Sequence, residues 1–119
     1  MSSLENERIK ALFEELSHKL CDELYSLNLE NSKLESIYYQ YYEIDGCKGV
    51  EEFFRIAYLT VIKLVNDETI LNIKEREKRL STVAAALIDL SQKTPNRFDG
   101  LSQSLFNTIL VSCAQQLHH

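Results

Sequence analysis

The chain of 119 residues carries a formal net charge of −5, with 45% hydrophobic and 26% charged residues. This length and apolar content allow one domain with a real core and exclude intrinsic disorder, and three cysteines are too few for a disulfide scaffold. The 3 Gly and 1 Pro leave little room for the turns of a β-sandwich or barrel. We therefore expect an all-α fold, a single compact helical bundle of four to six helices spanning residues 1–119.

The predicted compartment follows from the N-terminal segment and the cysteines. The chain runs directly into an amphipathic pattern without the basic flank and apolar stretch of a secretory signal, and its most apolar window, residues 53–65, falls short of the ~20 residues of a bilayer span. Cys21, Cys47 and Cys113 form no Cys-x-x-Cys pair, which is typical of free thiols in a reduced compartment. We expect a cytoplasmic protein. His118-His119 are either native or the remnant of a purification tag.

The first predicted helix shows the clearest periodicity in the chain. Ser2 and Glu5 form a capping box at its start. Its apolar residues recur at steps of three and four, which predicts one buried face: Ile9, Leu12, Phe13, Leu16, Leu20, Leu24 and Leu27.

A second helix is predicted over residues 33–44, because Ser32 and Glu35 form another capping box. Its inward residues are Leu34, Ile37, Tyr38, Tyr41 and Ile44. Gly46 and Gly49 are expected to supply the left-handed or open conformations that end this helix and turn the chain.

The third predicted helix starts near Val50 and is apolar most of the way round. One face holds Val50, Phe53, Phe54, Ala57, Val61, Leu64 and Val65, and the other sides hold Ile56, Leu59 and Ile62. Such a helix is central in its bundle or shared with a second chain.

Residues 68–92 allow either one helix or two, with Asn66 or Asp67 as the cap. A continuous helix places Arg76 and Glu77 on the apolar stripe, so the segment is split near residue 74 or these long side chains snorkel to water. The stripe consists of Ile73, Leu80, Val83, Ala84 and Leu87.

The last helix is predicted over residues 101–117, after a loop marked by Pro95, with Asp99 as its cap. Its apolar stripe consists of Leu105, Phe106, Ile109, Leu110, Cys113 and Leu117.

Glu15 and His18 match the Glu-x-x-His spacing of di-iron bundle proteins, and Asp22 follows one turn later. These three side chains lie roughly 150° from the apolar face, so a solvated face is the simpler interpretation. The pairs Glu14-Glu15 and Asp22-Glu23 leave a carboxylate–metal helical hydrolase as an alternative, which requires acidic clusters on two facing helices. No glycine-rich phosphate loop or activated nucleophile is visible. We predict no catalytic residue, no cofactor and no metal, hence a protein that is not an enzyme.

A nucleic-acid-associated helical regulator is a further alternative, based on the segment from Lys74 to Arg79 with its four bases and two acids. Acids interleaved at this density favour ion pairs within a helix over phosphate binding.

The charge is unevenly distributed along the chain. Residues 1–47 hold 10 acids and 4 bases, whereas residues 48–119 hold 8 acids and 9 bases. An acidic arm of this kind can compete for a basic surface of another protein. We therefore predict a small protein–protein interaction module, of inhibitor, immunity-protein or adaptor type, that masks a partner surface. Its predicted partner-binding residues are Tyr39, Tyr42, Glu14, Glu15, Asp22 and Glu23, the tyrosines because they are favoured at interfaces.

The stretch from Leu101 to Leu117 has no charged residue. Because depletion of charged residues is typical of buried interface area, we predict that this helix pairs two chains as a homodimer. The alternative is that it is a central helix buried within one chain. The predicted self-association residues are Leu59, Ile62, Phe106, Leu110 and Leu117.

Overall fold

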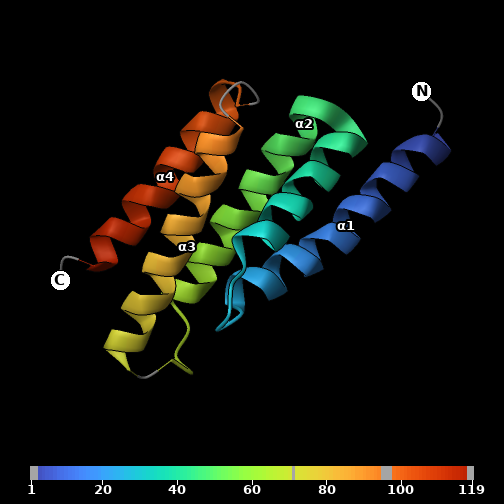
Figure 1. Ribbon diagram of the computed structural model, residues 1–119. Helices are drawn as coiled ribbons and strands as arrows, with labels where there is room; N and C mark the ends of the chain where they lie inside the picture. Colours follow the sequence, from blue (N-terminus) through green and yellow to red (C-terminus); the bar gives the residue numbers. More distant parts are fainter. Residues whose placement is uncertain (1–2, 71, 95–97, 118–119) are drawn as a thin grey trace.

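The computed structural model describes residues 3–70, 72–94 and 98–117, and within them the chain forms four helices and no strand. The helices are α1 (Ser3–Tyr25), α2 (Asn31–Val65), α3 (Ile73–Lys93) and α4 (Gly100–Leu117). They build three layers: α1 packs on one side of α2, and α3 and α4 pack side by side on the other (Figure 1). The all-α prediction is confirmed. None of the described helices has the length and apolarity of a membrane span.

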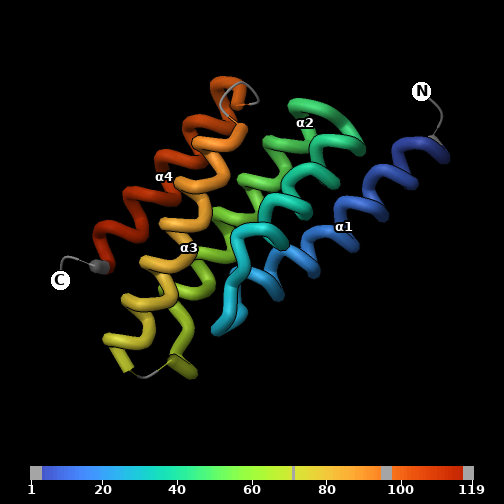
Figure 2. The backbone as a smooth tube through the Cα atoms, in the orientation of Figure 1, coloured from blue at the N-terminus to red at the C-terminus, as the bar shows by residue number. Residues whose placement is uncertain are grey.

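Helix α2 is a hairpin of two antiparallel arms (Figure 2). The backbone leaves the helical conformation at Asp45 and Gly46, and Gly46 has a positive φ of 58°. The two arms correspond to the predicted second and third helices, so the reversal at Gly46 is confirmed.

Gly49 has a different role from the predicted one. It lies inside the second arm, and its backbone is not left-handed. A Cβ on Gly49 would overlap the carbonyl oxygen of Tyr41 and lie 2.7 Å from its carbonyl carbon. The absence of a side chain therefore lets the two arms approach each other just below the reversal.

Two predicted features at the α1–α2 connection are wrong. Helix α1 ends at Tyr25, so Leu27 lies in the turn and is 71% exposed. Glu30 occupies the N-cap position of α2 without a side-chain cap bond, so Ser32 does not cap this helix. Instead, Glu23 Oε1 accepts a hydrogen bond from the Glu30 amide at 2.9 Å, which ties the turn to α1. The predicted cap Ser2 lies outside the described residues.

Helix α3 is unbroken from Ile73 to Lys93 and begins within two residues of the predicted split near residue 74, so residues 68–92 do not form one continuous helix. Its cap is Asn72, whose Oδ1 accepts from the Lys74 amide at 2.9 Å. Asp67, one of the two predicted caps, accepts bonds from Thr69 in the preceding turn.

Arg76 explains the ambiguous stripe of this segment. Its guanidinium donates hydrogen bonds to the backbone carbonyls of Asp67, at 2.9 Å, and Ile70, at 2.8 Å. These bonds stabilise the turn before α3. Ile73, assigned to the buried stripe by its spacing, is 70% exposed.

Helix α4 begins as predicted, because Asp99 Oδ1 accepts from the Ser102 amide at 2.9 Å. The predicted loop around Pro95 lies outside the described residues.

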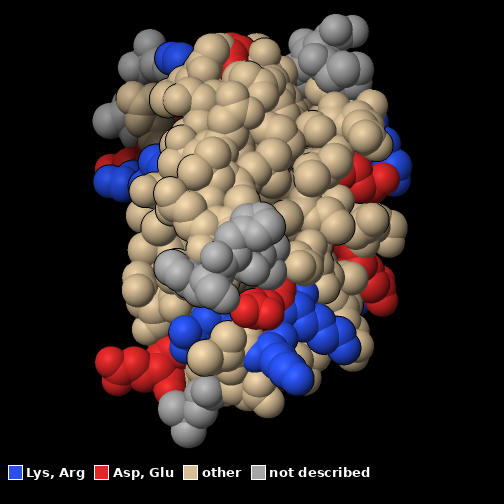
Figure 3. All heavy atoms as spheres, turned by 90° about the vertical axis from the view of Figure 1, so that its left-hand side faces the viewer, with Lys and Arg blue, Asp and Glu red and all other residues tan. Residues whose placement is uncertain are grey.

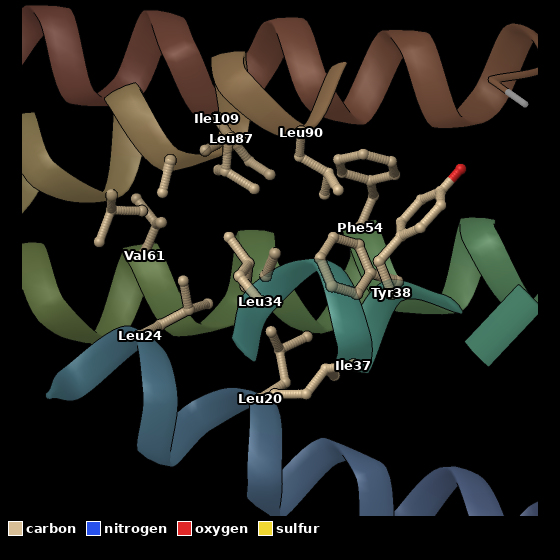
Figure 4. Packing of buried hydrophobic residues seen from close by; sticks show 14 of the residues in the cluster. Leu20, Leu24, Leu34, Ile37, Tyr38, Phe54, Val61, Leu87, Leu90 and Ile109 are labelled. Carbon is tan, nitrogen blue, oxygen red and sulfur yellow. The ribbon is translucent and has the colours of Figure 1, made fainter. Parts of the chain in front are cut away.

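The core is built around the α2 hairpin (Figure 4). Phe54 lies at the centre of an aromatic cluster, with ring centroids 4.7 Å from Phe98, 5.1 Å from Phe53 and 6.0 Å from Phe106. Tyr38 packs edge-on against Phe53 at 5.4 Å. Of the two interpretations of the third helix, its central position in the bundle is thus confirmed.

Candidate protein-binding surfaces

The outer faces of α3 and α4 form a broad surface without charge. From Leu80 to Ile88 and from Gly100 to Leu117 the sequence has no acidic or basic residue. The exposed side chains there, hereafter the uncharged surface, are Ser81, Thr82, Ala85, Ile88, Leu101, Gln103, Ser104, Asn107, Thr108, Val111, Ala114 and Gln115. Figure 3 views this side of the molecule and shows charged side chains gathered at the edges of an uncharged area. Leu101 and Val111 are each 54% exposed, and together with Ile88 at 41% they are the large exposed apolar side chains of the uncharged surface.

The predicted self-association residues fall in different places. Phe106 belongs to the core, 7% exposed and packed on Phe54, so it is not available to a second chain. Leu110 and Ile62 are half-buried, and Leu59 is 44% exposed on the second arm of α2. The side chain of Leu117 lies outside the described part.

The acidic side chains of α1 flank two different grooves. Glu15 borders a groove of about 510 Å³ between α1 and the first arm of α2, whose apolar lining is Ile9, Leu12, Leu16 and Ile44. Glu14 borders a groove of about 510 Å³ on the other flank of α1, opposite Arg55. Asp22 and Glu23 lie further along α1, facing Lys33 of α2. The acids therefore spread around α1 rather than forming one cluster.

Tyr39 and Tyr42 are both half-buried on the first arm of α2. They share a helix face with Glu35, which forms an ion pair with Lys93 of α3 at 3.3 Å. This face is directed towards α3, away from the acids of α1. The tyrosines and the acids of the predicted partner site are therefore on different sides of α2, and Tyr39 packs edge-on against the buried Tyr38.

Glu15, His18 and Asp22 are all exposed, as their helical phase predicts. Among the described residues no group of three His, Cys, Asp or Glu side chains is arranged to hold a metal ion.

Two of the four basic residues in the segment from Lys74 to Arg79 donate hydrogen bonds to backbone carbonyls of other segments and so stabilise the fold. Arg76 binds the turn before α3, and Arg79 donates to the Tyr25 carbonyl at 3.4 Å and pairs with Glu75 at 3.3 Å. Lys74 and Lys78 remain exposed.

The three cysteines have separate environments. Cys47 is exposed, as its place beside Gly46 suggests, and Cys21 Sγ lies 3.1 Å from Thr60 Oγ1. Burial raises the pKa of the Cys113 thiol to about 11, so this thiol is protonated at neutral pH.

Comparison with known proteins finds no family model, curated protein or solved structure that matches the chain. We therefore infer the function from the surfaces themselves.

The lack of charge in α4 was recognised from the sequence, but the contribution of α3 to the uncharged surface was not. The signal was present, since nine consecutive residues from Leu80 to Ile88 lack charge. It becomes visible only when α3 and α4 are placed side by side.

Proposed function

We propose that the chain is a cytoplasmic protein-binding module that acts as a homodimer. The uncharged surface pairs two copies, and the acidic α1 layer of each copy binds a basic surface of a partner protein, as an inhibitor or adaptor would. The observation that carries the proposal is the segregation of charge between the two outer layers of the molecule. Three free thiols support the reducing compartment.

A second copy is the occupant that the charge of the uncharged surface favours. In a two-fold symmetric dimer each patch faces an identical patch, so any net charge in the patch meets its own sign. Two copies of this chain repel each other because each has a net charge of −5. An uncharged face brings no like charges together when it meets the same face of a second copy.

The uncharged surface is of the size that a small interface needs. Helix α4 has 18 residues, which gives a length of about 27 Å. The nine uncharged residues of α3, Leu80 to Ile88, add about 14 Å of helix about 10 Å beside it, so the uncharged faces cover roughly 400 Å² in projection. A standard interface buries about 800 Å² of accessible surface per partner, so this footprint corresponds to the lower end of interface sizes.

The α1 layer supplies the partner-binding side. Helix α1 carries six acidic and three basic residues, and it lies on the opposite side of the α2 hairpin from the uncharged surface. A dimer formed through α3 and α4 therefore leaves both acidic layers exposed. Two outward acidic layers give such a dimer bivalent attraction for a basic partner.

The self-association is tested with Val111→Glu, which places like charges opposite each other in the dimer. We expect wild type to behave as a dimer in light scattering at tens of micromolar, and the variant to shift to a monomer. The matched control is Leu27→Glu, which introduces the same charge at an exposed leucine in the turn after α1. This variant should leave the dimer intact. A monomeric wild type, or a Val111→Glu variant that stays dimeric, contradicts the pairing.

The partner-binding side is tested by affinity capture from the source cell with Glu15→Lys and with Glu68→Lys. Both glutamates are exposed, and the charge change is the same, but Glu68 lies in the turn before α3. We expect Glu15→Lys to lose the basic proteins that wild type captures and Glu68→Lys to retain them. Equal capture of the basic proteins by both variants would show that α1 does not bind them.

A further inference from the structure

A pocket of about 400 Å³ lies where the α1–α2 turn meets the first half of α3. Its volume falls in the range of small-molecule sites, roughly 300–1,000 Å³. It lies outside the uncharged surface apart from Thr82 at its wall, and outside the α1 grooves. Residues of α1, of the α1–α2 turn and of α3 line it, so the tertiary structure forms it rather than a single helix.

The apolar part of the lining comes from both sides of the pocket. Leu24 and Val83 are buried beneath it, Leu29 is half-buried, and Leu27 is 71% exposed beside it. Leu27 continues the spacing of the α1 stripe but cannot reach the core, because the helix ends two residues earlier. A ligand with an apolar body would cover this leucine, and this burial favours binding.

The charged part of the lining holds one more cation than anions, since Lys78 and Arg79 stand against Glu75, and the other polar lining residues are neutral. Arg79 is held by the Tyr25 carbonyl and by Glu75, and its buried Nε has no hydrogen-bond partner among the described residues. Lys78 is exposed next to it and forms no ion pair with a described residue. Because Arg79 is paired with Glu75 and its Nε is buried, Lys78 is the cation that an anionic group in the pocket can reach.

We propose that this pocket binds an anionic amphiphile, a carboxylate with an aliphatic chain of medium length. The aliphatic chain would lie against Leu24, Leu27 and Val83, and the carboxylate would pair with Lys78. A neutral polar ligand would leave Leu27 exposed, and a cationic amphiphile would be repelled by Lys78 and Arg79. The proposal is independent of dimer formation, since no exposed apolar residue of the uncharged surface lines the pocket.

Titration calorimetry of the full chain with decanoate below its micelle concentration tests the site. We expect saturable binding of one molecule per chain. Decanol should bind at least tenfold more weakly because it lacks the charge, and decyltrimethylammonium should not bind. Absence of saturable binding by decanoate, or equal binding of decyltrimethylammonium, overturns the proposal.

Two pairs of variants place the site. Lys78→Glu should weaken decanoate binding at least tenfold, whereas Lys74→Glu, the same change one turn earlier on α3, should alter it less than twofold. Leu27→Asp should also weaken binding at least tenfold, and Leu101→Asp should not. All four side chains are exposed, so circular dichroism should show an unchanged fold. Wild-type affinity in both Lys78→Glu and Leu27→Asp would exclude this pocket.

Discussion

Replacing Phe54 by alanine is expected to lower the free energy of unfolding by about 4 kcal/mol, within the range found for buried aromatic residues. Phe54 is fully buried on the second arm of α2. Its ring is in edge contact with Phe53 of the same arm, Phe98 before α4 and Phe106 in α4. The substitution therefore opens a cavity where the central layer meets the α4 layer.

Urea denaturation at fixed protein concentration measures this loss. The control is Phe13→Ala, since Phe13 is half-buried on α1 and stacks on one ring, Tyr41, at 5.6 Å. We expect a clearly smaller loss for Phe13→Ala. Equal losses would mean that the cluster around Phe54 is not the centre of the core.

Gly49→Ala is expected to destabilise the protein by about 3 kcal/mol, at the upper end of what overpacking costs. The added methyl group overlaps the carbonyl oxygen of Tyr41, a backbone atom that no rotamer change can move. The two arms of α2 must then separate where the aromatic core begins, because Tyr41 and Phe53 pack against each other at 5.8 Å.

Gly100→Ala provides the matched comparison for Gly49→Ala. Gly100 starts α4, and a Cβ there meets nothing within 4 Å. Because alanine reduces the entropy of the unfolded chain, this variant should be as stable as wild type or more stable by up to about 1 kcal/mol. If Gly49→Ala were as stable as Gly100→Ala in urea, the close approach of the arms would be wrong.

Periodicity was sufficient to predict the helices and most of the core. It identified the buried residues of α2 and the Asp99 cap of α4, because both depend on spacing within one segment. It misassigned Leu27 and Ile73, which continue an apolar stripe beyond the point where the helix ends or begins. The turn around each of these residues decides whether the side chain reaches the core.

Contacts between distant segments were beyond sequence reasoning. Arg79 and the Tyr25 carbonyl are 54 positions apart, and no local pattern connects them. Gly49 was recognised as a turn residue, but its contact with Tyr41 depends on how closely the arms pack. Phe106 was predicted both for the apolar stripe of the last helix and for self-association; it is buried against Phe54, a contact between helices that the sequence of α4 alone does not show.

We propose that two copies pair through the uncharged surface, and sedimentation equilibrium of wild type at low and high salt tests this pairing. An interface without ion pairs gains nothing from low salt, and screening reduces the general repulsion between two chains of charge −5. We predict a dimer whose dissociation constant stays constant or falls as sodium chloride rises from about 50 to about 500 mM. A monomer at all salt concentrations, or a dimer that dissociates as salt is added, would show that the uncharged surface does not pair two copies.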